Sequence, residues 1–275
     1  MNTLPIGIFD SGVGGLTVYR ALKQVFPHEN FLYLGDTARL PYGTKTPDTI
    51  IQYALQAARL LVDAGVKFLV IACNTATGPA LPVLRKAYPQ LPIMGVIEPG
   101  AIAALALSKT KHIAVIATEA TVAAHSYQTA IHALNPQALV VEKATGLLVP
   151  LTEEGFLSGE IPEKVIHHYL DALLADPATR PDTLILGCTH FPVLTDVIHQ
   201  VVGGRIQIVD SSRAVSEAVR TYFAAHPDLM HTAKNPGQSA FWVTDGVGRF
   251  MRVAERFLGS AIASEAVRLV DFFAS

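Results

Sequence analysis

Two short apolar runs in this sequence end in the same way, and the chain's only two cysteines follow them. Residues 68–72 precede Cys73, residues 183–187 precede Cys188, and small polar residues come soon after each cysteine. Branched apolar residues in runs of about 4 to 8 predict strands that are buried on both faces, as in parallel sheets. Because open α/β sheets bind ligands outside the carboxyl ends of such strands, both thiols are predicted to lie where a ligand would bind.

The order of predicted elements repeats along the chain. A strand that leads into a polar loop is predicted at residues 6–11 and again at 112–121. After each come a helix, the strand that precedes a cysteine (called a cysteine strand below), a second helix and a closing strand. This order favours two similar α/β domains with parallel-rich sheets, residues 1–98 plus 210–275 and residues 99–209, although one large sheet with ordinary βα alternation would show the same order. In the two-domain arrangement, the ends of the two cysteine strands meet across one cleft.

Helices with the expected period fill the gaps between strands. Residues 49–64 place apolar side chains on one face and are followed by Gly65, which suits the position just after a helix. Residues 163–175 show the same pattern. The sequence also predicts a packed C-terminal helix over residues 247–273, with arginines on the face opposite its apolar side chains.

Composition favours a globular protein with a small or neutral partner. Half of the 275 residues are hydrophobic and 16% are charged, which argues against disorder. The formal net charge is −2 without blocks of like charge, so no nucleic-acid partner and no membrane partner is predicted. With no signal-peptide pattern and no apolar stretch of about 20 residues, we predict a cytoplasmic protein. There the cysteines are predicted to be free thiols, and their spacing predicts no metal site.

Two thiols on opposite walls of one cleft could act as a pair of proton carriers. If one thiolate removes a proton from a carbon atom while the opposite thiol supplies another, the product is the mirror-image centre and no cofactor is required. A single free cysteine is more often a small buried hydrophobe, but two cysteines at matched strand ends favour a functional role. A redox pair is the remaining alternative, and no motif of a resolving cysteine supports it.

The loop after the first strand holds Asp10, Ser11 and the glycines Gly12, Gly14 and Gly15. These glycines suit a backbone that comes close to a ligand, and they equally suit a tight strand-to-helix turn; the pattern is not GxGxxG. A carboxylate at position 10 either caps the next helix or faces the cleft and handles a proton or an ammonium group. Spacing alone leaves both roles open for Asp10.

Five sequence motifs between positions 10 and 192 can be compared with the motifs of known families. They are Asp10-Ser11-Gly-Val-Gly-Gly15, Tyr33-Leu-Gly-Asp36-Thr-Ala-Arg39-Leu-Pro-Tyr42-Gly43, Ala72-Cys73-Asn74-Thr75-Ala76, Gly95-Val-Ile-Glu98-Pro99-Gly100 and Leu186-Gly-Cys188-Thr189-His190-Phe-Pro192. Together they resemble the motifs of the glutamate racemase family, in the family's order. The resemblance implies a cofactor-independent isomerase that interconverts L- and D-glutamate and supplies D-glutamate for bacterial peptidoglycan biosynthesis. It also implies two α/β domains with the active site between them, and a homodimer.

The resemblance assigns roles to individual residues. Cys73 and Cys188 look like the family's acid/base pair, Asp10 and His190 look like the groups that assist them, and Glu153 matches a further carboxylate near the second cysteine. The residues that resemble the substrate-holding set are Asp10, Ser11, Tyr42, Gly43, Asn74, Thr75, Thr118, Thr121, Thr189 and His190. Most of this set is polar but uncharged, and hydroxyls with backbone N–H groups can hold carboxylates without an arginine clamp.

The sequence departs from the family pattern just upstream of Glu153. Many relatives have Ala-Cys-Pro where this chain has Ala144-Thr145-Gly146. The missing cysteine is not one of the catalytic pair, so the reaction is expected to survive the change. The change instead affects what can be expected of the local backbone and of the exact placement of Glu153.

Three rival functions are compatible with parts of the pattern. A relative in the same two-domain superfamily could act on aspartate, hydantoins or a malonate derivative, although those relatives do not share the first two motifs as a set. A two-domain binding protein could close over an amino acid without chemistry, and its binding would survive mutation of both cysteines. A protein that inhibits a partner such as a topoisomerase is neither supported nor excluded by the sequence.

Overall fold

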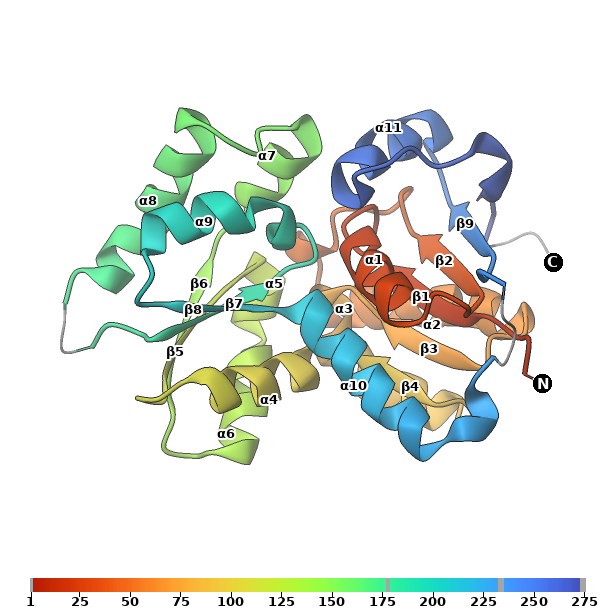
Figure 1. Ribbon diagram of the computed structural model, residues 1–275, viewed down its shortest axis with the longest axis horizontal. Helices are drawn as coiled ribbons and strands as arrows, with labels where there is room; N and C mark the ends of the chain where they lie inside the picture. The colour runs from red at the N-terminus through yellow and green to blue at the C-terminus, as the bar shows by residue number, and fades with distance from the viewer. Residues whose placement is uncertain (1, 177–178, 232–234, 273–275) are drawn as a thin grey trace.

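The computed structural model describes residues 2–176, 179–231 and 235–272, and it contains two β-sheets with helices on both faces (Figure 1). The strand order is β10-β9-β2-β1-β3-β4 in the first sheet and β6-β5-β7-β8 in the second. Every strand pair in the described part of the chain is parallel. The prediction of two α/β units with parallel sheets is confirmed.

The strands have the following bounds. The first sheet contains β1 (Ile6–Asp10), β2 (Phe31–Gly35), β3 (Phe68–Ile71), β4 (Ile93–Gly95), β9 (Ser239–Val243) and β10 (Val267–Leu269). The second contains β5 (His112–Ala117), β6 (Leu139–Ala144), β7 (Thr183–Gly187) and β8 (Gln207–Asp210). The chain passes between the sheets after β4 and again after β8. The predicted domain limits lie inside α4 and at the end of β8, and they stay a prediction.

Helices complete both halves. They are α1 (Leu16–Val25), α2 (Pro47–Asp63), α3 (Asn74–Ala87), α4 (Ile97–Leu107), α5 (Glu119–Ala123), α6 (Ser126–Leu134), α7 (Leu148–Glu154), α8 (Glu160–Leu174), α9 (Thr195–Val202), α10 (Ser211–Ala225) and α11 (Val247–Leu258). Short 3₁₀ turns are η1 (Tyr42–Thr44), η2 (Phe191–Leu194), η3 (Pro227–Leu229) and η4 (Ser264–Ala266). The predicted helices at 49–64 and 163–175 are α2 and α8, and Gly65 follows α2 with a positive φ of 82°.

The two halves share one strand order. In β2-β1-β3-β4 and in β6-β5-β7-β8, the first strand of the half pairs with the second on one side and with the cysteine strand on the other. The register matches as well, because Phe9 pairs with Ile71 and Ile116 pairs with Leu186, so each cysteine lies two residues beyond an equivalent pair. The same register makes Asp10 equivalent to Ala117.

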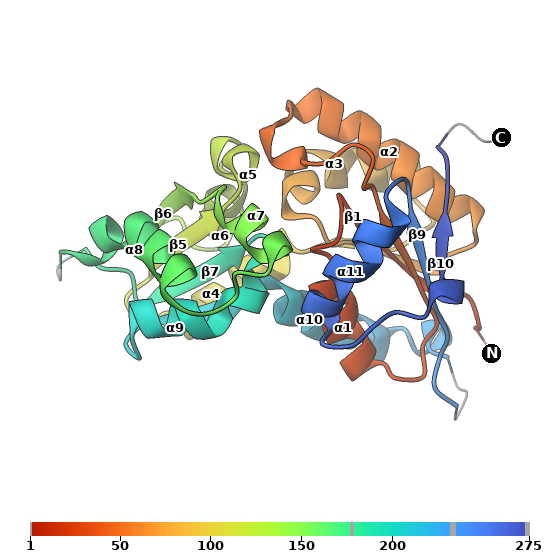
Figure 2. The ribbon, with the colours of Figure 1, turned by 90° about the horizontal axis from the view of Figure 1, so that it is seen from above.

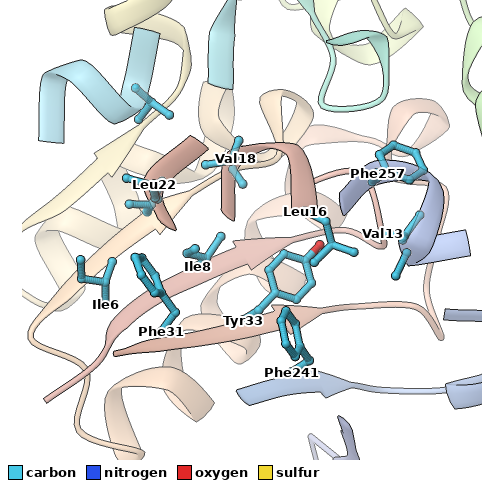
Figure 3. Packing of buried hydrophobic residues seen from close by; sticks show 14 of the residues in the cluster. Ile6, Ile8, Val13, Leu16, Val18, Leu22, Phe31, Tyr33, Phe241 and Phe257 are labelled. Carbon is cyan, nitrogen blue, oxygen red and sulfur yellow. The ribbon is translucent and has the colours of Figure 1, made fainter. Parts of the chain in front are cut away.

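Buried side chains fill the space between each sheet and its helices. The first sheet packs α1, α10 and α11 on one face and α2 and α3 on the other, whereas the second packs α7, α8 and α9 on one face and α4 and α6 on the other. Figure 3 shows the first of these clusters, with Leu16, Val18 and Leu22 of α1 above β1 and β2. There the buried Tyr33 hydroxyl donates to the backbone oxygen of Gly12 at 2.8 Å and anchors the loop after β1.

The C-terminal helix is shorter than predicted. α11 ends at Leu258, and Gly259 follows with a positive φ of 74°, a conformation that stops helices and that glycine adopts without steric cost. The predicted helix over 247–273 is therefore wrong beyond Leu258, and its last residue lies outside the described part. Residues 267–269 instead form β10, which pairs with β9. The apolar face of the first part is confirmed, because Phe250, Val253 and Phe257 are buried.

Candidate active site

A cavity of about 200 Å³ lies where the carboxyl ends of the two sheets face each other, and both cysteines line it. Cys73 and Cys188 are free thiols, each about 5% exposed. The predicted residues that line this cavity are Ser11, Tyr42, Gly43, Cys73, Asn74, Thr75, Thr118, Glu153, Cys188, Thr189 and His190. A larger hollow of about 960 Å³ beside α4, α9 and α10 contains none of them. The smaller cavity is the candidate site.

Two predicted residues, Asp10 and Thr121, are buried just behind the cavity lining. The hydroxyl of Thr121 lies 2.9 Å from that of Thr118 and 3.3 Å from that of Thr75. Thr75 and Thr118 are themselves 2.8 Å apart. Because Thr75 belongs to the first half and the other two to the second, three hydroxyls join the halves at this wall.

Asp10 ends β1 and is fully buried. It does not cap α1, whose N-cap is Gly15. Its Oδ2 accepts from the backbone N–H of Gly12 at 2.9 Å, and its Oδ1 accepts from the Thr189 hydroxyl of the other half at 3.5 Å. Burial raises the pKa of the Asp10 carboxyl, and the nearby His190 opposes this rise. Asp10 is therefore not the N-cap residue of α1, although its carboxyl also accepts a hydrogen bond from the backbone N–H of Gly15, and its role toward the substrate stays a prediction.

Cys73 follows β3 and stands at the N-terminus of α3. Its Sγ donates to the Ser11 hydroxyl at 3.4 Å. Burial, and next the charge of Asp10, raise the pKa of the Cys73 thiol to about 12. A thiol whose pKa is raised in this way keeps its proton near neutral pH.

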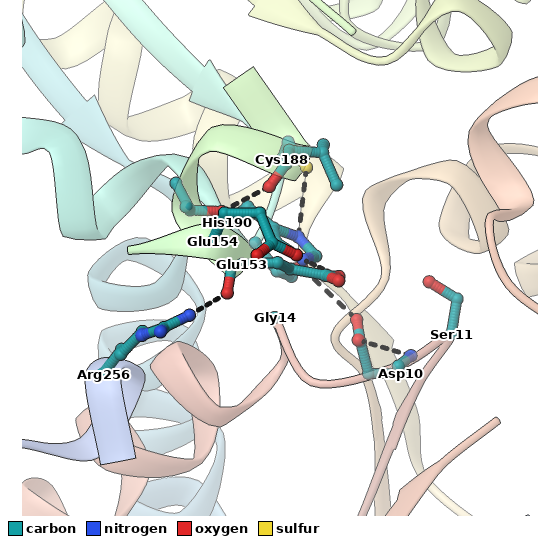
Figure 4. Close-up of polar contacts among 12 residues, drawn as sticks. Asp10, Ser11, Gly14, Glu153, Glu154, Cys188, His190 and Arg256 are labelled. Carbon is teal, nitrogen blue, oxygen red and sulfur yellow. Dashed lines mark hydrogen bonds and ion pairs between the residues drawn. The ribbon is translucent and has the colours of Figure 1, made fainter. Parts of the chain in front are cut away.

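Cys188 has a different neighbour, an imidazole. Its Sγ lies 3.8 Å from Nδ1 of His190, and Nε2 of His190 lies 3.1 Å from Oε1 of Glu153 (Figure 4). Burial lowers the pKa of His190, but its hydrogen bonds to Cys188 and Glu153 raise it more, to about 10. The hydrogen bond from His190 also lowers the pKa of Glu153. An imidazolium between Cys188 and a carboxylate is the arrangement that stabilises a thiolate.

Sequence reasoning missed Tyr127, which lies on α6 and is fully buried. Its hydroxyl donates to Oδ1 of Asn74 at 2.7 Å across the boundary between the halves. This bond fixes the orientation of the Asn74 amide and leaves Nδ2 buried without a hydrogen-bond partner in the described structure. Nothing in the sequence marks Tyr127, because it looks like any core residue of an amphipathic helix.

The glycine loop after β1 approaches protein side chains of the opposite half. A Cβ on Gly14 would lie 2.4 Å from Nδ1 of His190 and 2.4 Å from the Thr189 hydroxyl oxygen. Real Cβ atoms essentially never come so close to non-bonded neighbours, so any larger residue here would displace His190 or Thr189. The motif was noticed in the sequence, but its neighbours could not be known without the fold.

The departure at residues 144–146 leaves the local backbone regular. The N–H of Thr145 donates to the Ala117 oxygen at 2.9 Å, just as the N–H of Asp36 donates to the Asp10 oxygen at 3.0 Å in the other half. Gly146 lines the cavity, and a Cβ there would meet nothing within 4 Å. The other lining residues that were not predicted are Gly12, Leu40, Pro41, Thr44, Glu119, Val149 and Pro150.

Neither a metal-binding cluster nor a membrane-spanning helix occurs among the described residues. They contain no group of three or more His, Cys, Asp or Glu side chains placed to hold a metal ion. Within the same residues, a helix with the length and apolar character to cross a bilayer is absent.

Comparison with known proteins places this geometry in a family. A profile of the Asp/Glu/Hydantoin racemase family matches residues 6–219. The chain belongs to this racemase family. It is 44% identical over 267 residues to glutamate racemase of Neisseria meningitidis serogroup A, covering 97% of this chain and 96% of that protein.

Solved structures agree with the assignment. Glutamate racemase from Bacillus anthracis superposes with a TM-score of 0.91 at 32% identity and 98% coverage of both chains. Glutamate racemase from Francisella tularensis, solved in complex with D-glutamate, superposes with a TM-score of 0.90 at 34% identity and full coverage of both chains. The chain is thus an isomerase of the racemase type, and the resemblance seen in its motifs is confirmed.

Proposed function

We propose that this protein interconverts L- and D-glutamate by proton transfer between two thiols. The observation that carries the proposal is that Cys73 and Cys188, at equivalent positions of two similar halves, line one cavity. Family membership and the relatives' names support glutamate as the substrate. The roles of the individual residues, taken from the resemblance, are part of the proposal.

The reaction is balanced without a further reagent. A thiolate on one wall takes the proton from Cα, and the C–H electron pair remains on the substrate, delocalised into its α-carboxylate. The thiol on the other wall then gives its proton to the opposite face of Cα and becomes the thiolate. The enantiomer is inverted, and the two sulfurs have exchanged roles, so the reverse reaction starts from the state that the forward one leaves.

The surroundings of the thiols assign the resting state. Cys73 holds its proton because it is buried beside Asp10, whereas Cys188 faces the imidazolium of His190. We therefore assign Cys73 the role of the acid in the resting enzyme, with Cys188 on the opposite wall as its partner. Asp10 lies where it can receive or return a proton on the Cys73 side, and His190 serves the same purpose for Cys188.

Neutral polar groups are proposed to hold the substrate, since no arginine or lysine lines the cavity in the described structure. The unpaired Nδ2 of Asn74 is a buried donor without an acceptor, which a substrate carboxylate would supply. Asn74 also begins α3, and the N-terminus of a helix favours an anion. The hydroxyls of Thr75, Thr118 and Thr121 provide further donors on the same wall.

We extend the proposal to the physiological setting. The family resemblance supports a supply of D-glutamate for peptidoglycan, in the cytoplasm and without a cofactor or metal. A homodimer also stays a proposal, which sedimentation of the purified protein would test.

The experiment is deuterium incorporation at Cα when purified protein without added cofactor receives L-glutamate, and separately D-glutamate, in heavy water. Exchange with inversion from both enantiomers supports the proposal. Glutamate binding without exchange would favour the binding-protein alternative. An absence of binding would contradict glutamate as the substrate, and aspartate and hydantoins would be tried next.

A further inference from the structure

The helix α11 touches the active site of the opposite half. It belongs to the β9-α11-β10 segment of the first sheet, yet it faces α7 of the second half (Figure 2). Nη2 of Arg249 lies 3.0 Å from Oε2 of Glu153 and 3.5 Å from Oε1 of Glu154. Two turns further along α11, the guanidinium of Arg256 donates to the backbone oxygen of Glu153 (Figure 4).

Glu153 is held from both sides by these contacts. One carboxylate oxygen accepts from Arg249 of the first half and the other from His190 of its own half. The Glu153 side chain is only 15% exposed, so its contacts with Arg249 and His190 are partly shielded from water. Contacts therefore run without a break from Arg249 through Glu153 and His190 to Cys188.

The local backbone accommodates Arg256. α7 ends at Glu154, and Gly155 follows it with a positive φ of 88°. A Cβ at this position would lie 3.0 Å from the Arg256 guanidinium. Glycine therefore both ends α7 and leaves room for the arginine that anchors its last turn.

We propose that Arg249 and Arg256 are positioning residues that hold Glu153 against His190, so that the first half's C-terminal segment orients the acid/base group of the second half. The inference rests on the proposed two-thiol reaction. It adds two residues outside the family motifs, and it gives α11 a role beyond covering a sheet. In the described second sheet no strands beyond β6 correspond to β9 and β10.

The charges around Glu153 set the sign of the expected pH effect. The ionisable groups that face it are His190, Arg249, Arg256 and its chain neighbour Glu154. His190 lowers the pKa of Glu153 most, and Arg249 lowers it further. Without Arg249 the pKa of Glu153 rises, so the carboxylate is protonated at higher pH. The acid limb of kcat/KM should therefore move to higher pH.

Both directions of the reaction must respond together. Two enantiomers have the same free energy in water, so the ratio of kcat/KM for L- and D-glutamate is fixed at equality in every variant. Arg249→Gln is therefore expected to lower both values, by roughly three- to tenfold near neutral pH, because Arg249 is largely exposed and its ion pair is partly screened. The loss should be greater at the acid end of the profile.

The matched control is Arg252, an exposed arginine of the same helix that has no ion pair with Glu153. Arg252→Gln should keep the pH profile of the parent protein, and Arg249→Lys should recover part of the activity lost in Arg249→Gln. Arg256→Gln tests the backbone contact in the same way. Thermal unfolding of each variant identifies any effect that comes from stability alone.

A double-mutant cycle with Glu153→Gln distinguishes positioning from a purely structural role. If Arg249 acts through Glu153, Arg249→Gln has little further effect on kcat/KM in the Glu153→Gln background. An equal loss in both backgrounds, or an unchanged pH profile in Arg249→Gln, would overturn the inference. Failure of the parent protein to racemise glutamate would instead overturn the proposed function, so the two failures are distinguishable.

Discussion

The two halves of the molecule share a scaffold and differ in the chemistry placed on it. Each has four parallel strands in the same order, with a cysteine two residues past an equivalent strand pair. At the end of the first strand, however, one half carries Asp10 and the other carries Ala117. Two residues after the cysteine, one half carries Thr75 and the other carries His190. The shared scaffold accounts for the placement of the two thiols, and the residues that differ account for their different surroundings.

This difference suits a reaction between mirror images. The substrate and the product are of equal free energy, but in the proposed two-thiol reaction one thiol is charged and the other neutral at the start of each turnover. Burial and the charge of Asp10 raise the pKa of Cys73, which favours the neutral thiol on that wall, whereas Cys188 faces His190. Contacts across the boundary, such as that of Thr189 with Asp10, keep the two walls in one arrangement.

The largest effect is expected from removing either thiol. Cys73→Ser and Cys188→Ser should each lower racemisation by roughly 100- to 10,000-fold, the range of general acid–base catalysis. Each variant keeps one proton carrier, so Cα–H exchange in heavy water, followed by NMR, should persist for one enantiomer only. The preferred enantiomer should be opposite in the two variants. If both variants exchanged the same enantiomer, or if either variant racemised normally, the proposal that the two thiols serve opposite faces of Cα would be wrong.

Next in size is the effect of Asp10→Asn, which makes the first half more like the second. We expect racemisation to fall about 100-fold, because the group that serves Cys73 is lost. The charge of Asp10 raises the pKa of Cys73, so this pKa should fall in the variant. Alkylation of Cys73 by iodoacetamide, measured in the Cys188→Ser background, should then begin at lower pH.

In Asp10→Asn we thus expect Cys73 to react faster with iodoacetamide while the enzyme racemises glutamate more slowly. Alkylation that begins at the same or a higher pH in Asp10→Asn would show that burial alone holds the proton on Cys73.

Gly14→Ala and Gly146→Ala form a matched pair, because each glycine belongs to a loop beside the cavity but only one is enclosed. The new Cβ at position 14 would collide with His190 and Thr189, whereas at position 146 it would meet nothing within 4 Å. We expect Gly14→Ala to lower kcat/KM by roughly tenfold or more and the free energy of unfolding by about 1–3 kcal/mol. Gly146→Ala should leave both nearly unchanged. Equal kinetics and melting curves for the two variants would refute this account of the loop.

Much of the fold could be predicted from the sequence, because buried parallel strands carry a strong local signal. The cysteine strands, the first strand of each half and two covering helices all follow from runs and periods of apolar residues. β10 was missed because its three residues are a strand only through pairing with β9, and the predicted helix crossed Gly259.

The candidate site shows the same limit more sharply. Residues within the motifs, such as Asn74 and His190, could be named from the sequence and lie together in the cavity. Tyr127 and Arg249 could not be named in this way. Tyr127 bonds to Asn74, 53 positions away in the sequence, and Arg249 bonds to Glu153, 96 positions away, and both partners belong to the other half. A pattern of spacing describes one element at a time, and these contacts exist only once the halves are packed together.

The smallest effect is expected from Tyr127→Phe, which removes one hydroxyl behind the cavity wall. Without its 2.7 Å bond, the Asn74 amide is free to rotate, and its Nδ2 no longer has a fixed direction toward the substrate. A hydrogen bond of this kind contributes about 0.5–1.5 kcal/mol, so KM should rise about two- to tenfold while kcat changes little. Tyr19→Phe is the control, since its hydroxyl makes a 2.9 Å bond to Ser239 away from the cavity. If both variants raised KM equally, the effect would come from general loosening of the fold, and Tyr127 would have no part in holding the substrate across the boundary between the halves.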